Sequence, residues 1–193
     1  GTLPARAACI TFDDGYADNF HVAMPILQRH GLTATFFIAT GFLDGGRMWN
    51  DTIIETVRCR EDLSIEDRRA AIATHINAIK YRSVDDRVAV TEQLARSEGA
   101  TLPANLMMTS TEVKAMRKAG MQIGAHTVSH PILARLTDEQ ALQEIGNSKQ
   151  FLEDLLGERI GLFAYPNGKP GEDYSPQTVE VVRRLGFDAA VST

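Results

Sequence analysis

The sequence predicts an α/β protein with parallel strands, arranged as a barrel or as a doubly wound sheet. Short, continuous apolar runs, typical of strands buried on both faces, alternate with helical patterns that end in glycine. A helix between consecutive strands returns the chain to the same end of the sheet, so the strands run parallel. The apolar runs are residues 7–12, 33–39, 121–125, 160–165 and 187–191.

The helical patterns between these runs have recognisable starts and stops. The helix that precedes Gly157 begins at Thr137, because Thr137 and Gln140 have the spacing of a capping box. Glycines that follow the helical patterns as stops are Gly31, Gly120, Gly157 and Gly186. The apolar stripe expected on the first helix consists of Val22, Ile26 and Leu27.

One interval breaks this rhythm. Residues 50–98 contain no strand-like run and are typical of two or three charged helices. We expect residues 1–193 to form a single domain in which residues 50–98 are a helical insertion after the second strand. Loops after strands surround the active site in such folds, so the insertion is either a cap over a pocket or a passive packing element. The apolar positions of its helices are Ile53, Ile54 and Val57, then Ile65, Ile72, Ile76 and Ile79, then Val84, Val88 and Leu94.

Composition limits the classes of partner. The 193 residues are 44% hydrophobic, enough for one substantial core, and 20 Lys and Arg against 25 Asp and Glu give a net charge of −5. This balance offers no general attraction for nucleic acid or anionic membranes, so a neutral or cationic substrate fits better. No apolar segment approaches the roughly 18 to 20 residues of a membrane span. Residues 1–4 lack signal-peptide character, and localisation, whether cytoplasmic, periplasmic or in the cell envelope, stays open.

The cysteines and three of the histidines carry no evident chemistry. The spacing of Cys9 and Cys59 matches neither a zinc nor a redox motif, so we expect both to be core thiols. His21, His30 and His75 lie in helical patterns and are expected to be ordinary surface or core histidines.

Two polar clusters follow apolar runs. Asp13 and Asp14 end the first run, and His126 and His130 follow the third. Taken alone, the two aspartates followed by Gly15 are typical of a turn. Taken alone, the two histidines are typical of ordinary surface or core residues. Together, at strand ends that meet at one edge, they favour a metal site made of one carboxylate and two imidazoles, with the second carboxylate free to move protons. The expected chemistry is metal-assisted hydrolysis.

A third element, residues 163–168 (Phe-Ala-Tyr-Pro-Asn-Gly), ends the next strand with a turn. The three elements in this order resemble the polysaccharide deacetylases of carbohydrate esterase family four. Thr-Phe-Asp-Asp-Gly at 11–15 and His-Thr-x-x-His at 126–130 are complete copies of that family's first two motifs. The resemblance implies an irregular, incomplete (β/α) barrel that removes N-acetyl groups from amino-sugar units of a polysaccharide or oligosaccharide and releases acetate.

The resemblance also implies a role for each residue. Asp13 is the general base, and Asp14, His126 and His130 hold a divalent metal, Zn²⁺ first, with Co²⁺, Ni²⁺ or Mn²⁺ as alternatives. The backbone N–H of Asn167 matches the family's donor to the oxyanion. The glycan is then the expected partner, with no nucleic acid and no membrane span.

The third motif departs from the family pattern. It usually reads Arg-x-Pro-Tyr, with the arginine holding the catalytic aspartate, and here Ala164 stands at the arginine position. This Ala-Tyr-Pro form resembles branches that act in exopolysaccharide synthesis. Tyr165 and Pro166 are the expected substrate contacts. Trp49 is either a sugar-stacking platform or a packing residue at a helix start. The family's last two motifs, a tryptophan-bearing wall and a Leu-x-His that supplies an acid, do not occur before Thr193.

Three other functions remain open. The first is a related metal-dependent amidohydrolase that opens a non-sugar amide. The second is a catalytically impaired carbohydrate-binding domain, which Ala164 and the missing motifs favour. The third is a structural α/β domain without a metal.

Overall fold

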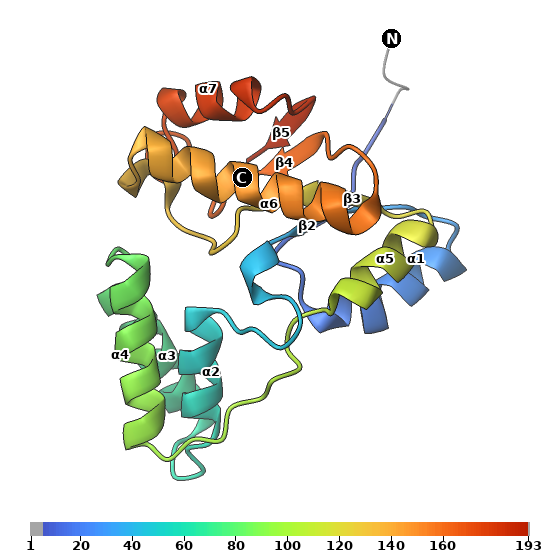
Figure 1. The fold of residues 1–193 in the computed structure, drawn as a ribbon. Helices are drawn as coiled ribbons and strands as arrows, with labels where there is room; N and C mark the ends of the chain where they lie inside the picture. The colour runs from blue at the N-terminus through green and yellow to red at the C-terminus, as the bar shows by residue number, and fades with distance from the viewer. Residues whose placement is uncertain (1–5, 193) are drawn as a thin grey trace. The chain divides into compact units, whose positions relative to one another are not determined.

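The computed structural model describes residues 6–192. Residues 1–4, on which the expected lack of a signal peptide rests, and Thr193 lie outside the described residues. Five strands pair in parallel in the order of the chain and form a curled half-barrel (Figure 1). The predicted irregular, incomplete (β/α) barrel is thereby confirmed. The strands are β1 (Thr11–Phe12), β2 (Thr35–Ile38), β3 (Gln122–Ala125), β4 (Leu162–Ala164) and β5 (Ala189–Val191).

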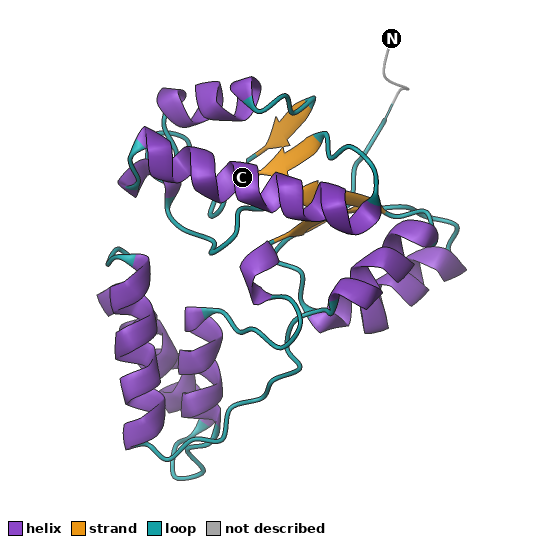
Figure 2. Ribbon diagram, in the orientation of Figure 1, coloured by secondary structure: helices purple, strands orange, loops and turns teal. Residues whose placement is uncertain are grey.

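The chain divides into two compact units. The first comprises Gly1–Asp44 and Met107–Thr193 and contains the sheet, and the second is Gly45–Leu106. Helices accompany every strand-to-strand connection of the first unit (Figure 2). They are the π-helix η1 (Asn19–Ala23), α1 (Met24–Arg29), the 3₁₀ turns η2 (Thr40–Phe42) and η3 (Leu133–Arg135), α5 (Ser110–Lys118), α6 (Asp138–Leu156) and α7 (Pro176–Arg184).

Helix α6 has the limits that its sequence predicts. Thr137 is the N-cap, its hydroxyl accepts a hydrogen bond from the Gln140 N–H, and the Gln140 side chain returns one to the Thr137 backbone. The helix ends at Gly157, whose φ of 67° places it in the left-handed region that glycine adopts without steric cost. Helix α6 packs on β3 and beside α5 and α7, so its position is fixed from several sides.

The core of the first unit lies between the middle strands and these helices. Phe36, Ile38 and Phe163 are completely buried, and the Phe12 ring stacks on Phe36 at 4.8 Å between centroids. Full burial of a side chain of this size is favourable by about 1.5–3 kcal/mol relative to exposure. The middle strands are therefore held firmly, and the loops that leave their carboxyl ends start from fixed positions.

The two edge strands differ from the sequence expectation. Residues 7–12 and 187–191 were expected to be buried on both faces, but Ile10 and Val191 are 37% and 41% exposed, and Cys9 is exposed as well. Each outer strand pairs on one side only within residues 6–192. Continuous apolar runs indicate a strand, but they do not distinguish a central strand from an edge strand. The expectation that Cys9 is a core thiol is wrong.

The apolar stripe expected on the first helix is also wrong in part. Val22 and Ile26 are 55% and 46% exposed, whereas Met24 and Leu27 are buried. The cause is the π-helical turn η1, which has more residues per turn than an α-helix and rotates the buried face. Buried Asn19 and buried Met24 are accordingly five residues apart.

The second unit is a three-helix element with a core of its own. Helices α2 (Trp49–Arg58), α3 (Ile65–Ile79) and α4 (Val84–Ser97) surround the buried side chains of Ile53, Val57 and Ile79. Ile65 and Val88, which were expected on the apolar faces, are exposed. Cys59 follows the last residue of α2 and is exposed, so the second expected core thiol is also wrong. The three histidines expected to carry no chemistry, His21, His30 and His75, are exposed.

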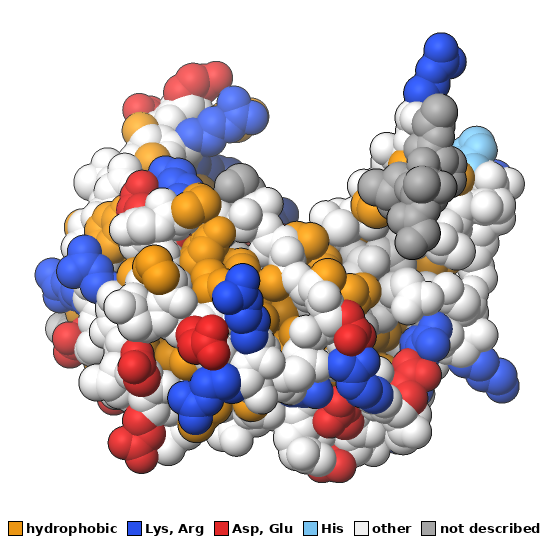
Figure 3. All heavy atoms as spheres, turned by 90° about the horizontal axis from the view of Figure 1, so that it is seen from above, with side chains coloured by type: hydrophobic (Ala, Val, Ile, Leu, Met, Phe, Trp, Pro, Cys, Tyr) orange, Lys and Arg blue, Asp and Glu red, His pale blue; other side chains and the backbone are white. Residues whose placement is uncertain are grey.

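The surface carries charges of both signs. On the face drawn in Figure 3, Lys and Arg side chains alternate with Asp and Glu, and no broad single-sign field covers that face. None of the helices within residues 6–192 is both long enough and apolar enough to cross a bilayer.

Candidate metal centre and active site

The two aspartates occupy a strained turn at the carboxyl end of β1. Asp14 has a φ of 75°, in the left-handed region that aspartate visits more readily than most residues, and Gly15 has a φ of 92°. The Gly15 N–H donates to the Asp13 carbonyl at 2.9 Å, and the Asp14 carbonyl accepts from Ala39 N–H after β2 at 3.2 Å. The turn is thereby attached to the neighbouring strand, which holds a backbone conformation that is costly in isolation.

His126 follows β3 directly and is almost completely buried. Its Nδ1 lies 2.8 Å from the Ala164 carbonyl oxygen at the end of β4. A carbonyl oxygen only accepts hydrogen bonds, so this contact assigns the proton to Nδ1 and leaves the lone pair on Nε2. Backbone carbonyls commonly fix metal-binding histidines in this way. The chain therefore presents His126 Nε2 as a ready ligand.

The loop from His126 to His130 reverses within four residues. Thr127 and His130 have φ values of 65° and 51°, both in the left-handed region. The Thr127 hydroxyl donates to the His126 carbonyl and accepts from the His130 N–H at 3.1 Å. This local network brings the second imidazole back beside the first, with ring centroids 4.9 Å apart.

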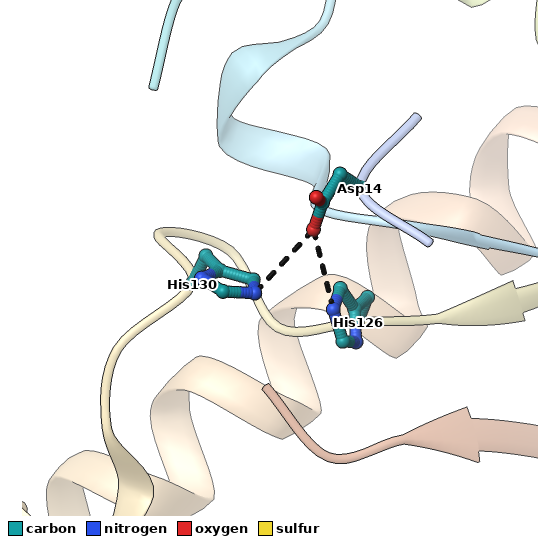
Figure 4. Close-up of side chains that lie close together, drawn as sticks. All are labelled: Asp14, His126 and His130. Atoms are coloured by element: carbon teal, nitrogen blue, oxygen red, sulfur yellow. Dashed lines mark ion pairs between the residues drawn. The ribbon is translucent and has the colours of Figure 1, made fainter. Parts of the chain in front are cut away.

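Asp14, His126 and His130 converge on one point, as Figure 4 shows. The Asp14 Oδ1 atom lies 3.4 Å from His126 Nε2 and 3.4 Å from His130 Nε2, and all three ligand atoms lie within 4.8 Å of one another. Ligands held about 2.0–2.2 Å from zinc in a tetrahedron are separated by about 3.3–3.6 Å. The two 3.4 Å separations match that spacing, so the donor set fits a tetrahedral divalent ion with a fourth position for water.

A second observation on Asp14 Oδ1 also fits a metal site. It is buried and accepts no hydrogen bond from the described residues, although buried carboxylate oxygens are normally satisfied. Burial alone would raise the pKa of Asp14, but the polar contact with His126 and the charges of His130 and His126 outweigh burial and hold the pKa below its ordinary value. The site therefore favours the ionised carboxylate that metal binding requires.

Asp13 has a different environment. Burial of its carboxyl raises the pKa of Asp13, His126 opposes this, and the charge of Asp14 adds to it. The residue as a whole remains exposed, so water can reach the carboxylate. Within residues 6–192, no hydrogen bond or ion pair holds the Asp13 side chain. An effective general base has a pKa near the working pH, so raising the pKa of the Asp13 carboxyl brings it closer to the value that suits catalysis at neutral pH.

The turn after β4 contains the remaining expected residues. Tyr165 and Pro166 are buried, and the Tyr165 ring stacks on Tyr174 with 3.9 Å between centroids. Burial raises the pKa of Tyr165 to about 12. Asn167 follows with a φ of 62°. Tyr165 and Pro166 thus contribute to packing in this structure, and their contact with substrate stays a prediction, as does the role of the Asn167 N–H.

Trp49 lies in the second unit. It is half-buried at the start of α2, where it packs on that unit's apolar core, and the Arg87 guanidinium lies 5.2 Å from its ring centroid. This contact is a cation–π interaction with a buried arginine. The packing interpretation accounts for the observed contacts of Trp49, and its role as a sugar platform stays a prediction.

Two residues that support the histidine loop were missed by sequence reasoning. Glu144 on α6 accepts hydrogen bonds from the loop, and Gly41 in η2 donates its N–H to the Val128 carbonyl at 2.9 Å. For Glu144 a signal existed, because it is a charged residue three positions after buried Ala141 and one before buried Ile145. A carboxylate beside the buried stripe of a helix needs a polar partner.

We expect Gly41→Ala to weaken zinc binding. A Cβ at residue 41 would lie 2.7 Å from the Val128 carbonyl oxygen, so the histidine loop would have to move. Overpacking of this kind costs about 1–3 kcal/mol. Zinc affinity by competition with a chelator and unfolding by circular dichroism would measure the effect.

Gly146→Ala is the matched control, since a Cβ there meets only Leu185 at an ordinary 3.4 Å in the interior of α6. It should keep zinc affinity and fold at least as stably as the parent chain. Equal zinc affinity in both variants would contradict the role given to Gly41.

Comparison with known proteins identifies relatives of the chain. Over 188 residues the chain is 21% identical to "Putative polysaccharide deacetylase YxkH" of Bacillus subtilis (strain 168), a match that covers 97% of this chain and 45% of YxkH. Its fold is similar to that of Streptococcus pyogenes deacetylase PplD, solved in complex with acetate, with a TM-score of 0.62, 23% identity, and coverage of 100% of this chain and 58% of PplD.

A second solved structure with a similar fold is IcaB from Ammonifex degensii, with a TM-score of 0.62, 21% identity, and coverage of 98% of this chain and 61% of IcaB. The chain thus spans between 45% and 61% of the length of these relatives. The family model described as polysaccharide deacetylase matches residues 1–190, and the chain belongs to that family.

Proposed function

We propose that this chain carries the catalytic site of a metal-dependent hydrolase that removes N-acetyl groups from amino-sugar units of a polysaccharide or oligosaccharide and releases acetate. The observation that carries the proposal is the convergence of Asp14, His126 and His130 at tetrahedral spacing, next to the separate carboxylate of Asp13. Membership of the polysaccharide deacetylase family supports the choice of reaction, and the acetate held by PplD is the product expected here.

The donor set favours zinc as the cofactor. Two imidazole nitrogens and one carboxylate oxygen are typical zinc ligands, and Co²⁺, Ni²⁺ and Mn²⁺ accept the same donors. When bound, the ion supplies a Lewis acid that polarises the amide carbonyl and lowers the pKa of water. Asp14, His126 and His130 would hold it, and the His126 contact with the Ala164 carbonyl keeps Nε2 aimed at the site.

Different residues of the chain transfer the proton and stabilise the developing negative charge. Asp13, exposed and with a raised pKa, takes the proton from the attacking water and can return it to the leaving amine. The Asn167 backbone N–H is the proposed donor to the oxyanion that forms on the amide carbonyl. Tyr165 and Pro166 fix the turn from which that N–H projects, which gives their packing a role in the reaction.

The substrate class follows from charge and family. A net charge of −5 does not attract nucleic acid or anionic lipid, whereas an N-acetylated glycan is a neutral substrate and its deacetylated product is cationic. We propose an N-acetylated glycan as the partner.

The direct test is acetate release from N-acetylglucosamine oligomers by the zinc-loaded chain, compared with the chain after chelation. Metal-dependent acetate release supports the proposal. Free amine or ring-opened product from small amides, without acetate from the oligomers, would instead identify a related amidohydrolase on a non-sugar substrate.

A second candidate function is a catalytically impaired carbohydrate-binding domain. It is favoured by Ala164 at the family's arginine position and by the lack of a side-chain partner for Asp13 within residues 6–192. It predicts saccharide binding, for example by calorimetry with the same oligomers, without acetate release at saturating zinc.

A further inference from the structure

A carboxylate on α6 holds the loop that separates the two histidines. The Glu144 Oε2 atom accepts hydrogen bonds from the N–H of Val128 at 3.0 Å and of Ser129 at 2.9 Å. Its Oε1 atom accepts from the Ser129 hydroxyl at 2.7 Å. Three charge-assisted hydrogen bonds thus connect one side chain to two consecutive loop residues.

The opposite side of the same loop is held by backbone. The carbonyls of Thr127 and Val128 accept hydrogen bonds from the N–H groups of Thr40 at 3.1 Å and Gly41 at 2.9 Å. The loop is therefore held from two sides. Backbone N–H groups of η2 donate to its carbonyls, and the Glu144 carboxylate on α6 accepts from its N–H groups. Glu144 is the member of this arrangement that a side-chain substitution can remove without altering backbone hydrogen bonds to η2.

The loop needs such support because of its conformation. Thr127 and His130 are both left-handed, and side chains with branched or bulky Cβ groups adopt that region at a cost. Costly backbone conformations persist only where the surroundings hold them. Releasing residues 128 and 129 would let the loop relax and would move His130 away from Asp14.

The anchor itself is rigid. Glu144 lies in the second turn of α6, next to Ile145, which is completely buried, and α6 packs on β3, from which His126 emerges. A group held on a packed helix positions a ligand more accurately than one on a mobile loop.

We propose that Glu144 is a positioning residue of the metal centre, which sets the His126-to-His130 loop in the geometry that binds the ion. The inference rests on the proposed metal-dependent function. Within residues 6–192, the Glu144 carboxylate bonds to the Val128 and Ser129 N–H groups and the Ser129 hydroxyl, not to an imidazole nitrogen, so its effect is exerted through the loop.

The experiment measures zinc dissociation constants by chelator competition for the parent chain, Glu144→Ala, Glu144→Gln and Glu139→Ala. Groups that orient metal ligands typically contribute about 10- to 100-fold in affinity, so Glu144→Ala should bind zinc about 10- to 100-fold more weakly. Glu144→Gln should restore most of the affinity, because an amide oxygen at the Oε2 position still accepts both backbone N–H groups. Glu139, exposed on the first turn of α6, is the matched control and should leave the affinity unchanged.

The visible spectrum of the cobalt-loaded variants reports the coordination geometry of the ion and does not depend on overall stability. Glu144→Ala should change the band pattern of tetrahedral Co²⁺, and Glu144→Gln should retain it. If Glu144→Ala does not fold, the test uses Ser129→Ala and Glu144→Gln instead. Ser129→Ala removes only the hydroxyl contact with Glu144 and should bind zinc more weakly than the parent chain does.

The outcomes distinguish the positioning role of Glu144 from the existence of the metal site. If the parent chain binds zinc and the folded Glu144 and Ser129 variants bind it equally well, the role of Glu144 is wrong and the metal site stands. If the parent chain binds no zinc, the metal site itself is wrong, and the positioning role falls with it.

Discussion

Replacing Asp13 by Asn is expected to reduce acetate release by about a hundredfold to ten-thousandfold, the usual contribution of a positioned general base. Zinc content should stay normal, because the proposed metal ligands are Asp14, His126 and His130, and Asp13 is not among them. The amide of Asn preserves size and polarity but cannot accept the proton of the attacking water. Turnover with N-acetylglucosamine oligomers and zinc content measured on the same preparation provide the comparison.

Asp18→Asn is the matched control for that variant. Asp18 is exposed in the same segment and makes no side-chain hydrogen bond at the start of η1, so its loss should leave both turnover and zinc content near the parent values. Near-normal acetate release by Asp13→Asn with normal zinc would show that another group removes the proton.

The fold was predictable because its signals are local. Each strand is a short apolar run, and each helix before a strand ends at a glycine, so residues 121–125 or 160–165 could be located without tertiary information. The polar clusters after those runs could then be assigned to one edge of the sheet. The structure brings Asp14, His126 and His130 together at that edge.

Other features depend on tertiary structure and were not predictable. The exposure of Cys9 depends on β1 being an edge strand, and that of Val22 on the π-helical turn of η1, neither of which changes the local apolar pattern. The contact between His126 Nδ1 and the Ala164 carbonyl joins residues 38 positions apart. Ala164, at the family's arginine position, thus holds the His126 ring through its backbone carbonyl, and a motif written in side chains does not indicate such a contact.

The contacts of the histidine loop illustrate the same limit. Glu144 stands 14 positions after His130, and its place beside the buried stripe of α6 indicates that it needs a polar partner, but nothing in the sequence identifies residues 128 and 129 as that partner. Sequence motifs predict which residues bind a metal because ligand chemistry is tied to residue type. The groups that orient such ligands are less tied to residue type, because carboxylates, backbone carbonyls and water can all supply the contact.

Removing one histidine is expected to abolish tight zinc binding. His130→Ala takes away one of the three proposed ligands, and the remaining two would not enclose the ion. The affinity should therefore fall by more than the roughly 10- to 100-fold that loss of an orienting group costs. His130 is the better choice than His126, because His126 is buried and bonded to the Ala164 carbonyl, so its loss would also disturb the contact between β3 and β4.

Two further variants make that result specific. His130→Cys supplies a thiolate, itself a common zinc ligand, and should recover part of the affinity that His130→Ala loses. His30→Ala removes an exposed histidine after α1 and should bind zinc as the parent does. Chelator competition measures all three. If His130→Ala retained full zinc affinity, the ion would be held elsewhere, and the 3.4 Å separations from Asp14 Oδ1 would reflect only an ion pair between a carboxylate and two imidazoles.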